Sequence, residues 1–227
     1  FAKKKISNFL NIENSSNLII PHGVNENKIR KDIKQESIKN FNHENPFKIV
    51  YLSTIEPYKH QWNVIEAISN LIDEGFPLSL TLIGSAYKKS YRRMLNVKRV
   101  NDANENWCDY IGYLDRSKIM EKIESYNLGV FASSCENLPN IVLEKMAAGL
   151  PIASSNYGPM PEVLGNNCQY FNPRNVKEIS EAVKILILSK DLRYSYVKKN
   201  IANLKRYTWE NCSDQTFKFI ATTLKKV

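Results

Sequence analysis

From residue 47 onward, short apolar runs alternate with longer stretches in which apolar residues recur every three or four positions. The short runs predict buried strands, and the longer stretches predict amphipathic helices. In residues 61–75, the apolar side chains from Val64 to Ile72 would share one helical face, and Gly75 would end the helix. The predicted strands are 48–53, 78–84, 109–114, 128–133, 151–155 and a short one at 168–171. The predicted helices are 61–75, 87–100, 117–126, 139–148, 175–189, 191–206 and 209–224.

This alternation of strands and helices predicts an α/β fold, a Rossmann-like doubly wound parallel sheet with right-handed crossovers. Residues 128–133 are small and apolar, as a strand covered on both faces should be. Ligands of such sheets bind outside the carboxyl ends of the strands. The two ends of the chain stand outside the alternation. Residues 1–12 predict a helix, 17–25 a short strand with a turn, and the segment up to 46 a polar connector.

Composition narrows the class of protein. The 227 residues are 43% hydrophobic and 24% charged, which suits one large globular domain. No run of about 18 apolar residues predicts a membrane span, and the basic start FAKKK lacks the features of a signal peptide. The chain begins at Phe1, which we interpret as part of a longer protein. Four scattered cysteines and three scattered histidines argue against a disulfide framework or zinc site, and favour reduced thiols in the cytoplasm.

The net charge of +9 favours acidic partners such as phosphorylated substrates or anionic lipid head groups. Residues 87–100 hold six Lys or Arg and no acid. At helical spacing we expect these charges to spread around the axis, so a solvated face is favoured and a membrane-facing or polyanion-facing patch is the alternative. Nucleic-acid binding rests on charge alone, because no basic motif interleaved with aromatic residues supports it, and we do not predict it.

Candidate chemistry lies in residues 133–155, which follow the strand at 128–133. Pro139 suits the first helical position, and a glycine and a proline end this helix near residue 150. The amides at its start would point into the crevice, where they can hold a phosphate. Glu136 precedes this seat, and Glu144 lies one to two turns into the helix, where a carboxylate can bind the two hydroxyls of a ribose. The plain alternative is a capping acid and a solvated glutamate.

This segment resembles the E-x7-E signature of retaining glycosyltransferases of the GT-B fold, in the large family numbered four. The matching text runs from Glu136 to Glu144 and continues as KMAAGLPI. Each further match is weak alone, but together they follow the order of the family over nearly the whole chain. They are IIPHGV, YLSTIEPYKH with its lysine Lys59, LTLIGSA, IGYLDRSKIMEKIESYNLGVFAS, GPMPEVL with Glu162, and YTWENCS.

The resemblance implies two Rossmann-like domains that face each other across a cleft. This chain would be the C-terminal half, and the acceptor-binding N-terminal domain would be its missing partner. Residues 1–20 would then be the tail of that domain and 21–46 the interdomain linker. Residues 47–206 would form the nucleotide-sugar-binding domain, and the helix in 207–227 would pack back toward the N-terminal domain.

The resemblance also implies roles for single residues. Lys59 would neutralise the donor diphosphate, and Glu136 would contact hydroxyls of the donor sugar near the anomeric centre. Glu144 would bind the ribose. Glu162 fits its motif, but it can equally cap the helix that follows. The other implied donor-binding residues are Asn137, Leu138, Pro139, Asn140 and Ile141 at the phosphate, Thr54, Gly84 and Ser85 beside the diphosphate, and Gly112, Tyr113 and Leu114 at the base.

One departure from the family is relevant to activity. Where the family usually has an arginine in G-R-x-x-x-x-K, this chain has Ser53 and Thr54, and a neighbour such as Lys88 or Lys89 would have to supply the second cation. Three interpretations therefore stay open. The first is a glycosyltransferase, the second is a catalytically silent nucleotide-sugar-binding module, and the third is another two-Rossmann enzyme such as a sugar-nucleotide epimerase or a phosphorylase.

The first interpretation is our leading hypothesis. A retaining glycosyltransferase would move a hexosyl or related group from a nucleotide-diphosphate sugar to a glycan or lipid-linked acceptor in surface polysaccharide synthesis. We expect no cofactor and no metal, since no Asp-x-Asp occurs. We expect a cytoplasmic location, with contact to the inner face of the membrane left open. The fragment alone would bind its donor weakly and transfer nothing.

Overall fold

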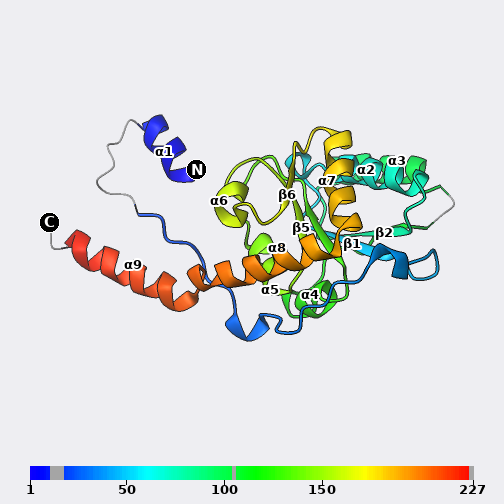
Figure 1. The fold of residues 1–227 in the computed structure, drawn as a ribbon. Coiled ribbons are helices and arrows are strands. Elements are labelled where there is room, and N and C mark those ends of the chain that lie inside the picture. The colour runs from blue at the N-terminus through cyan, green and yellow to red at the C-terminus, as the bar shows by residue number, and fades with distance from the viewer. Residues whose placement is uncertain (11–17, 104–105, 225–227) are drawn as a thin grey trace.

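The computed structural model describes residues 1–10, 18–103 and 106–224. Its centre is a six-stranded sheet of order β3-β2-β1-β4-β5-β6, and all of its neighbouring strands are parallel (Figure 1). The predicted doubly wound α/β fold is therefore confirmed. The strands are β1 (Phe47–Leu52), β2 (Leu78–Ile83), β3 (Cys108–Tyr110), β4 (Leu128–Phe131), β5 (Ile152–Ser155) and β6 (Gln169–Phe171).

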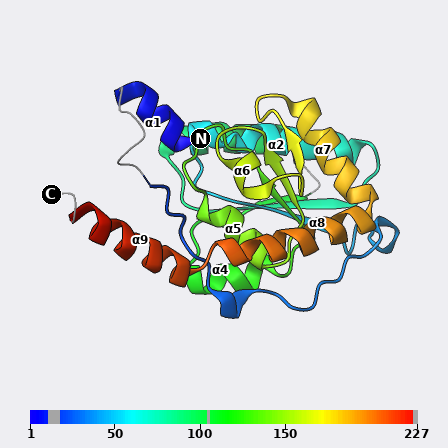
Figure 2. The ribbon, with the colours of Figure 1, turned by 60° about the vertical axis from the view of Figure 1, so that its left-hand side comes forward.

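Helices cover both faces of this sheet. Figure 2 shows α2 and α7 on one face, where they pack against each other, and α4, α5 and α8 on the other. The helix α3 packs beside α2. None of the described helices is long and apolar enough to cross a membrane. The helices are α1 (Ala2–Leu10), α2 (Gln61–Asp73), α3 (Lys88–Asn101), α4 (Arg116–Ile123), α5 (Asn140–Ala147), α6 (Met160–Leu164), α7 (Val176–Leu188), α8 (Lys190–Asn203) and α9 (Trp209–Leu224).

The core lies between the sheet and these helices. All four residues of β4 are buried, as the small apolar run predicted. The face of α2 is also as predicted, since Val64, Ile65, Ile68 and Leu71 are completely buried. Full burial of one such side chain contributes about 1.5–3 kcal/mol to the free energy of unfolding. The core thus fixes the sheet, and the sheet places the loops at its carboxyl edge.

The six cations of α3 spread around the helix axis, as predicted, but two of them have partners within the domain. Lys98 pairs with Asp102 at 2.7 Å, and Arg93 stacks on the Trp62 ring at 4.0 Å. The remaining four cations of α3 are all exposed. At 3.6 residues per turn, they fall within an arc of about 100°. These four cations therefore form one basic face of the helix. Of the other two, Arg93 packs against α2 and Lys98 pairs with the Asp102 carboxylate.

The strand predicted at 17–25 is wrong for the part that the structure describes, which begins at residue 18. That part is extended but joins no sheet, and its one bridge is Val24 with Thr208. The Val24 amide donates to the Tyr207 carbonyl at 2.8 Å. A Cβ on Gly23 would lie 2.1 Å from the Trp209 nitrogen, so only glycine permits this crossing.

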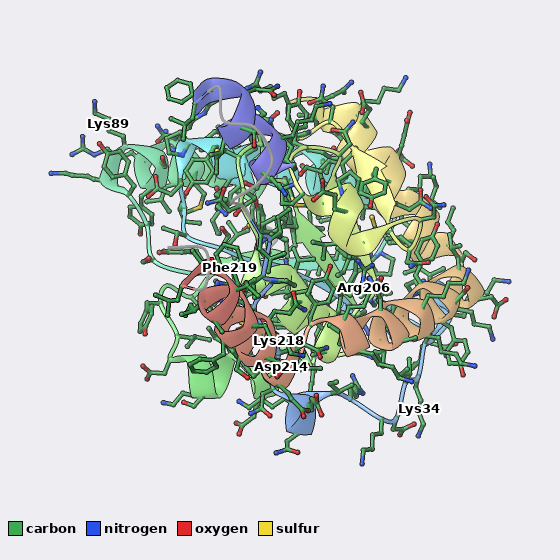
Figure 3. All side chains as sticks on the ribbon, turned by 90° about the vertical axis from the view of Figure 1, so that its left-hand side faces the viewer. Lys34, Lys89, Arg206, Asp214, Lys218 and Phe219 are labelled. Atoms are coloured by element: carbon green, nitrogen blue, oxygen red, sulfur yellow. The ribbon has the colours of Figure 1, made fainter. Side chains whose placement is uncertain are left out.

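Both terminal helices extend away from the sheet. Figure 1 shows α1 and α9 on the side of the molecule opposite α3. They expose large apolar side chains, among them Phe9 on α1 and Phe217 on α9, and α9 buries none of its residues. In Figure 3, α9 lies in front of the domain with Asp214 and Lys218 paired along it, at 2.7 Å. Residues 11–12 of the first predicted helix and 225–227 of the last segment lie outside the described residues.

Candidate functional site

A cavity of about 400 Å³ opens at the carboxyl ends of the central strands. In the sheet, β2 lies on one side of β1 and β4 lies on its other side. The strand order therefore reverses between β1 and β4, which makes this edge the topological switch point of the sheet. Open α/β sheets bind ligands at such a point. The cavity is lined by Leu52, Ser53, Thr54, Lys59, Ile83, Gly84, Ser85, Tyr113, Leu114, Ile119, Glu136, Leu138, Pro139, Asn140 and Ile141.

Lys59 and Glu136 form an ion pair in this cavity. The Lys59 Nζ donates to the Glu136 Oε1, and the two side chains are only 10% and 13% exposed. The same ammonium lies 5.2 Å from the ring centroid of Tyr58 and 5.1 Å from that of Phe131. The aromatic faces and the carboxylate all attract this positive charge. Lys59 is the one cation among the described lining residues.

Hydrogen bonds join the loop of Lys59 to the loop of Glu136. The buried Tyr51 hydroxyl donates to the Lys59 carbonyl and accepts from the Ala132 amide at 3.2 Å. Burial raises the pKa of Tyr51 well above its ordinary value, so the hydroxyl keeps its proton. The His60 Nε2 and the Ser134 Oγ are 2.9 Å apart. The ion pair therefore rests on loops that are fixed to each other and to two strands.

Gly84 shapes the wall of the cavity at the end of β2. Its φ is +143°, and a Cβ there would lie 2.3 Å from the Ser53 carbonyl oxygen. Only glycine allows the two loops to approach so closely. The Gly84 amide donates to the Gly112 carbonyl at 2.8 Å, which holds the loop after β3 against this wall. Tyr113, which is 71% exposed, and Leu114 then line the cavity.

The N-terminus of α5 forms the opposite wall. The sequence predicts that Pro139 is the first helical residue. Its ψ of 96° is extended, so it is the N-cap residue and the helix begins one residue later, at Asn140. The first backbone bond runs from the Val142 amide to the Pro139 carbonyl at 2.9 Å. The Asn140 and Ile141 amides precede it, and no described side chain caps the helix. Amides at this position, with the helix dipole, favour an anion.

Three residues predicted for the site do not line this cavity. Glu144 lines a neighbouring cavity of about 360 Å³, beside Gly23 and Trp209, and Asn140 contributes to both. Asn137 lines a third hollow of about 600 Å³. Gly112 is not among the described lining residues, but its carbonyl accepts the hydrogen bond from the Gly84 amide in the cavity wall. Glu144 is four positions after Asn140 on α5, about 6 Å further along the helix axis, so the two cavities adjoin along α5.

Glu162 also falls elsewhere. It lies in the first turn of α6 and lines the hollow of Asn137 rather than the central cavity. The neighbours proposed to replace the missing arginine, Lys88 and Lys89, are exposed on α3 and line none of these cavities. Ser53 and Thr54 do line the central cavity and carry no charge. The described lining of the central cavity thus has a single positive side chain.

A second cation lies behind the cavity, where sequence analysis did not place one. Lys145 of α5 is completely buried, and its Nζ donates to the Val130 carbonyl at 2.7 Å. It lies 5.2 Å from the Phe131 ring centroid, the ring that Lys59 also contacts. Burial, and then the charge of Lys59, lower the pKa of Lys145 to about 7. A Cβ on Gly129 would lie 3.0 Å from the Lys145 Cδ, so the glycine in β4 leaves room for this side chain.

Comparison with known proteins identifies the family of this chain. Residues 32–203 match the family model of glycosyl transferases group 1. The chain belongs to this family. A relative, the O-antigen chain mannosyltransferase B of Escherichia coli, is 26% identical over 167 residues, which are 74% of this chain and 44% of that protein. This family member therefore spans less than half the length of that relative.

Solved structures of other proteins share the fold. A glycosyltransferase from Rickettsia africae superposes with a TM-score of 0.82 at 16% identity, over 100% of this chain and 62% of that one. The Anabaena protein HepE, solved in complex with UDP and glucose, has a TM-score of 0.74 at 18% identity, over 92% of this chain and 56% of that one. At these identities the likeness shows the GT-B domain fold of the family member and not its substrates.

Proposed function

We propose that this chain is the nucleotide-sugar-binding domain of a retaining glycosyltransferase. The complete enzyme would transfer a sugar from a nucleotide-diphosphate donor to a glycan or lipid-linked acceptor, in the cytoplasm, during surface polysaccharide synthesis. One observation carries the proposal: a lysine, a carboxylate and the open N-terminus of α5 meet in one cavity at the switch point of the sheet. Membership of the family and the O-antigen relative support the reaction class.

The donor diphosphate would lie between Lys59 and the first amides of α5. Both groups are positive and both line the cavity. A charged hydrogen bond from Lys59 would contribute about 1.5–3 kcal/mol to binding. Glu144 lies further along α5 in the adjoining cavity, so a nucleoside that extends past Asn140 would reach its carboxylate with the ribose. The loop of Gly112 and Tyr113 would then lie near the base.

Donor binding would rearrange the ion pair. In the structure the Lys59 ammonium already has a carboxylate partner in Glu136. A diphosphate carries more negative charge than one carboxylate, and it would compete for the same ammonium. Glu136 would then be released toward the hydroxyls of the donor sugar. The pair would thus hold both side chains in place until the donor arrives and then exchange partners.

The chemistry follows from where charge develops. As the bond from the anomeric carbon to the distal phosphate breaks, negative charge grows on the phosphate oxygens. Fixed donors that point at that charge stabilise the transition state more than the ground state. Lys59 and the amides of Asn140 and Ile141 would act in this way without a metal ion. Closure of the N-terminal domain, which would bind the acceptor, would exclude water from the site.

The terminal segments fit this assignment. The apolar side chains that α1 and α9 expose would contact the N-terminal domain, with residues 21–46 as the linker between the domains. Residues 47–206 would bind the donor, and the segment 207–227 would pack back across the linker. The isolated chain would therefore bind a nucleotide weakly and transfer no sugar.

A catalytically silent nucleotide-sugar-binding module is the second candidate. The observation in its favour is that the cavity has Lys59 as the one cation among its described lining residues, with Ser53 and Thr54 in place of a second positive side chain. Lys145 is completely buried and cannot contact a ligand directly in this arrangement. Such a module would bind the donor but leave the leaving group too weakly stabilised for transfer.

Calorimetric titration of the chain with UDP, GDP and ADP tests the donor site. We expect one nucleotide to bind, and we expect Lys59→Ala to weaken that binding about tenfold or more. Glu144→Ala should weaken it too, whereas Lys199→Ala, which removes an exposed charge from α8, should not. Equal affinity in all four proteins, or binding of none of the nucleotides, would contradict the donor site.

A transfer assay separates the two candidates. The complete protein is incubated with the nucleotide sugar of the base identified by titration and with membrane and glycan extracts as acceptors. Release of the free nucleoside diphosphate together with a labelled product supports the glycosyltransferase. Tight donor binding without release, in a complete protein that is folded, supports the silent module.

A further inference from the structure

The helix α3 carries a basic face that no part of the donor-site proposal uses. Its four cations are exposed, and among the described residues none of them forms an ion pair. No acidic residue occurs in α3. The face projects from the end of the sheet opposite α9, and in Figure 3 the labelled Lys89 points away from the rest of the molecule. The four cations are Lys88, Lys89, Arg92 and Arg99.

Apolar side chains lie beside these cations rather than under them. Tyr87 at the start of the helix is 50% exposed, Leu95 is 37% exposed and Val100 is 76% exposed. By helical periodicity Leu95 and Val100 flank the arc of cations on its two sides. The residues that anchor α3 to the domain, Ser90 and Met94, are on the other side and buried. Exposure of these apolar side chains to water is unfavourable, and a partner that covers them would remove this cost.

Cations mixed with exposed apolar residues on one helix face are typical of surfaces that lie on a bilayer. The ammonium and guanidinium groups meet lipid phosphates, while the apolar side chains and the aliphatic stems enter the boundary of the acyl chains. A nucleic acid would satisfy the cations but would offer Leu95 and Val100 no apolar partner. The observations therefore favour lipid over RNA or DNA.

We propose that the exposed face of α3 binds an anionic membrane surface. The contact is electrostatic at first, since each Lys or Arg near such a surface contributes roughly a fivefold gain in partition. Insertion of Leu95 and Val100 then adds apolar burial. Because α3 begins three residues after Ser85, which lines the central cavity, this contact holds the cavity close to the lipid. The proposal stands on α3 alone and does not depend on the donor site.

Flotation of this chain with lipid vesicles tests the proposal. Vesicles of phosphatidylcholine are compared with vesicles that contain about 30% phosphatidylglycerol, at about 0.1 M and about 0.5 M salt. We expect binding to the anionic vesicles alone, weakened at the higher salt. The Arg92→Gln and Arg99→Gln double variant should bind roughly 25-fold less. Since both side chains are exposed, circular dichroism should show an unchanged fold.

Two further variants identify the face. Lys199→Gln with Lys205→Gln removes the same charge from the α8 region and should bind nearly as well as the unaltered chain. Leu95→Ser with Val100→Ser keeps every charge and should still lose binding at the higher salt. Equal loss in the α3 and α8 variants, equal binding to neutral vesicles, or no binding to anionic vesicles would overturn the proposal. So would tighter binding to a single-stranded RNA, measured by fluorescence anisotropy, than to the vesicles.

Discussion

The buried amine of Lys145 makes the stability of the domain depend on pH in a way that one substitution should abolish. Lys145 has no solvent exposure, and burial together with the charge of Lys59 lowers its pKa from 10.5 to about 7. Between these two values the unfolded chain holds the proton and the folded chain does not. The free energy of unfolding must therefore rise as the pH rises from about 7 to about 10.5.

The size of this effect follows from the two pKa values. Each pH unit within the window contributes at most about 1.4 kcal/mol, so the total is about 5 kcal/mol. Lys145→Met keeps the buried stem and removes the titration. Loss of the hydrogen bond to the Val130 carbonyl costs about 1 kcal/mol, so the variant should be about 3–4 kcal/mol more stable than the unaltered chain at pH 7. That advantage should shrink to zero or below by pH 10.

Urea unfolding, followed by tryptophan fluorescence at several pH values from 6 to 10, measures this difference. Other titrating groups are common to both proteins, so they cancel in the comparison. Lys199→Met changes an exposed lysine and should alter stability by less than about 0.5 kcal/mol at every pH. A constant difference between Lys145→Met and the unaltered chain across the window would refute the reasoning. If Lys145→Met is less stable than the unaltered chain at pH 7, interactions of the buried ammonium fully offset the cost of its burial.

Three other predictions concern the frame of the site. Tyr51→Phe removes the hydroxyl that bonds the Lys59 carbonyl, and urea unfolding should show a loss of about 1–3 kcal/mol, whereas an unchanged midpoint would mean that the loops hold without it. Gly84→Ala should lower the thermal midpoint well beyond Gly75→Ala, because both have positive φ but only Gly84 faces a backbone clash; equal shifts would contradict the clash. Asn175→Ala removes the cap of α7 and should cost about 1 kcal/mol in urea, without affecting nucleotide binding.

The fold is predictable because the central strands are mostly buried, with β4 and β5 buried along their whole length. Such strands appear in the sequence as apolar runs between helical patterns, and β1, β2, β4 and β5 begin within one residue of the prediction. The third strand is shorter than predicted, although most of 109–114 is apolar. Gly112 has φ of +73°, so the chain leaves the sheet before it and turns toward the cavity. Apolar character there reflects the cavity wall and not a strand.

The short α6 escapes sequence analysis for a different reason. It has five residues, too few for a helical period to be seen, and it begins after Pro159. The segment 18–25 resembles a strand in sequence because it contains a short apolar run. However, its Val24 amide donates a hydrogen bond to Tyr207, which is distant in sequence and belongs to no sheet. Local pattern alone does not contain that partner.

Most predicted site residues follow strand ends, and ends of parallel strands meet at one edge. The family resemblance assigned Lys59, Gly84 and Glu136 to one site, and the meeting of the strand ends explains why they line one cavity. Sequence alone does not suffice for Tyr51 and Lys145, because their importance depends on what surrounds them. A tyrosine in a strand and a lysine in a helix have many ordinary explanations. A lysine placed among the apolar residues Val142, Leu143 and Met146 of one short helix is a signal that could have identified Lys145.

The crossing of residues 21–24 with residues 207–209 has a mechanical consequence. Gly23 lies against the Trp209 backbone and Val24 is bonded to Tyr207, so the two chain segments that leave the domain are fastened to each other at one point. Segments joined at a single point move together, and they rotate about that point more readily than they separate. Gly23 and Trp209 also line the cavity of Glu144. A torque applied through α9 therefore acts on the walls of that cavity, and filling the cavity resists the rotation.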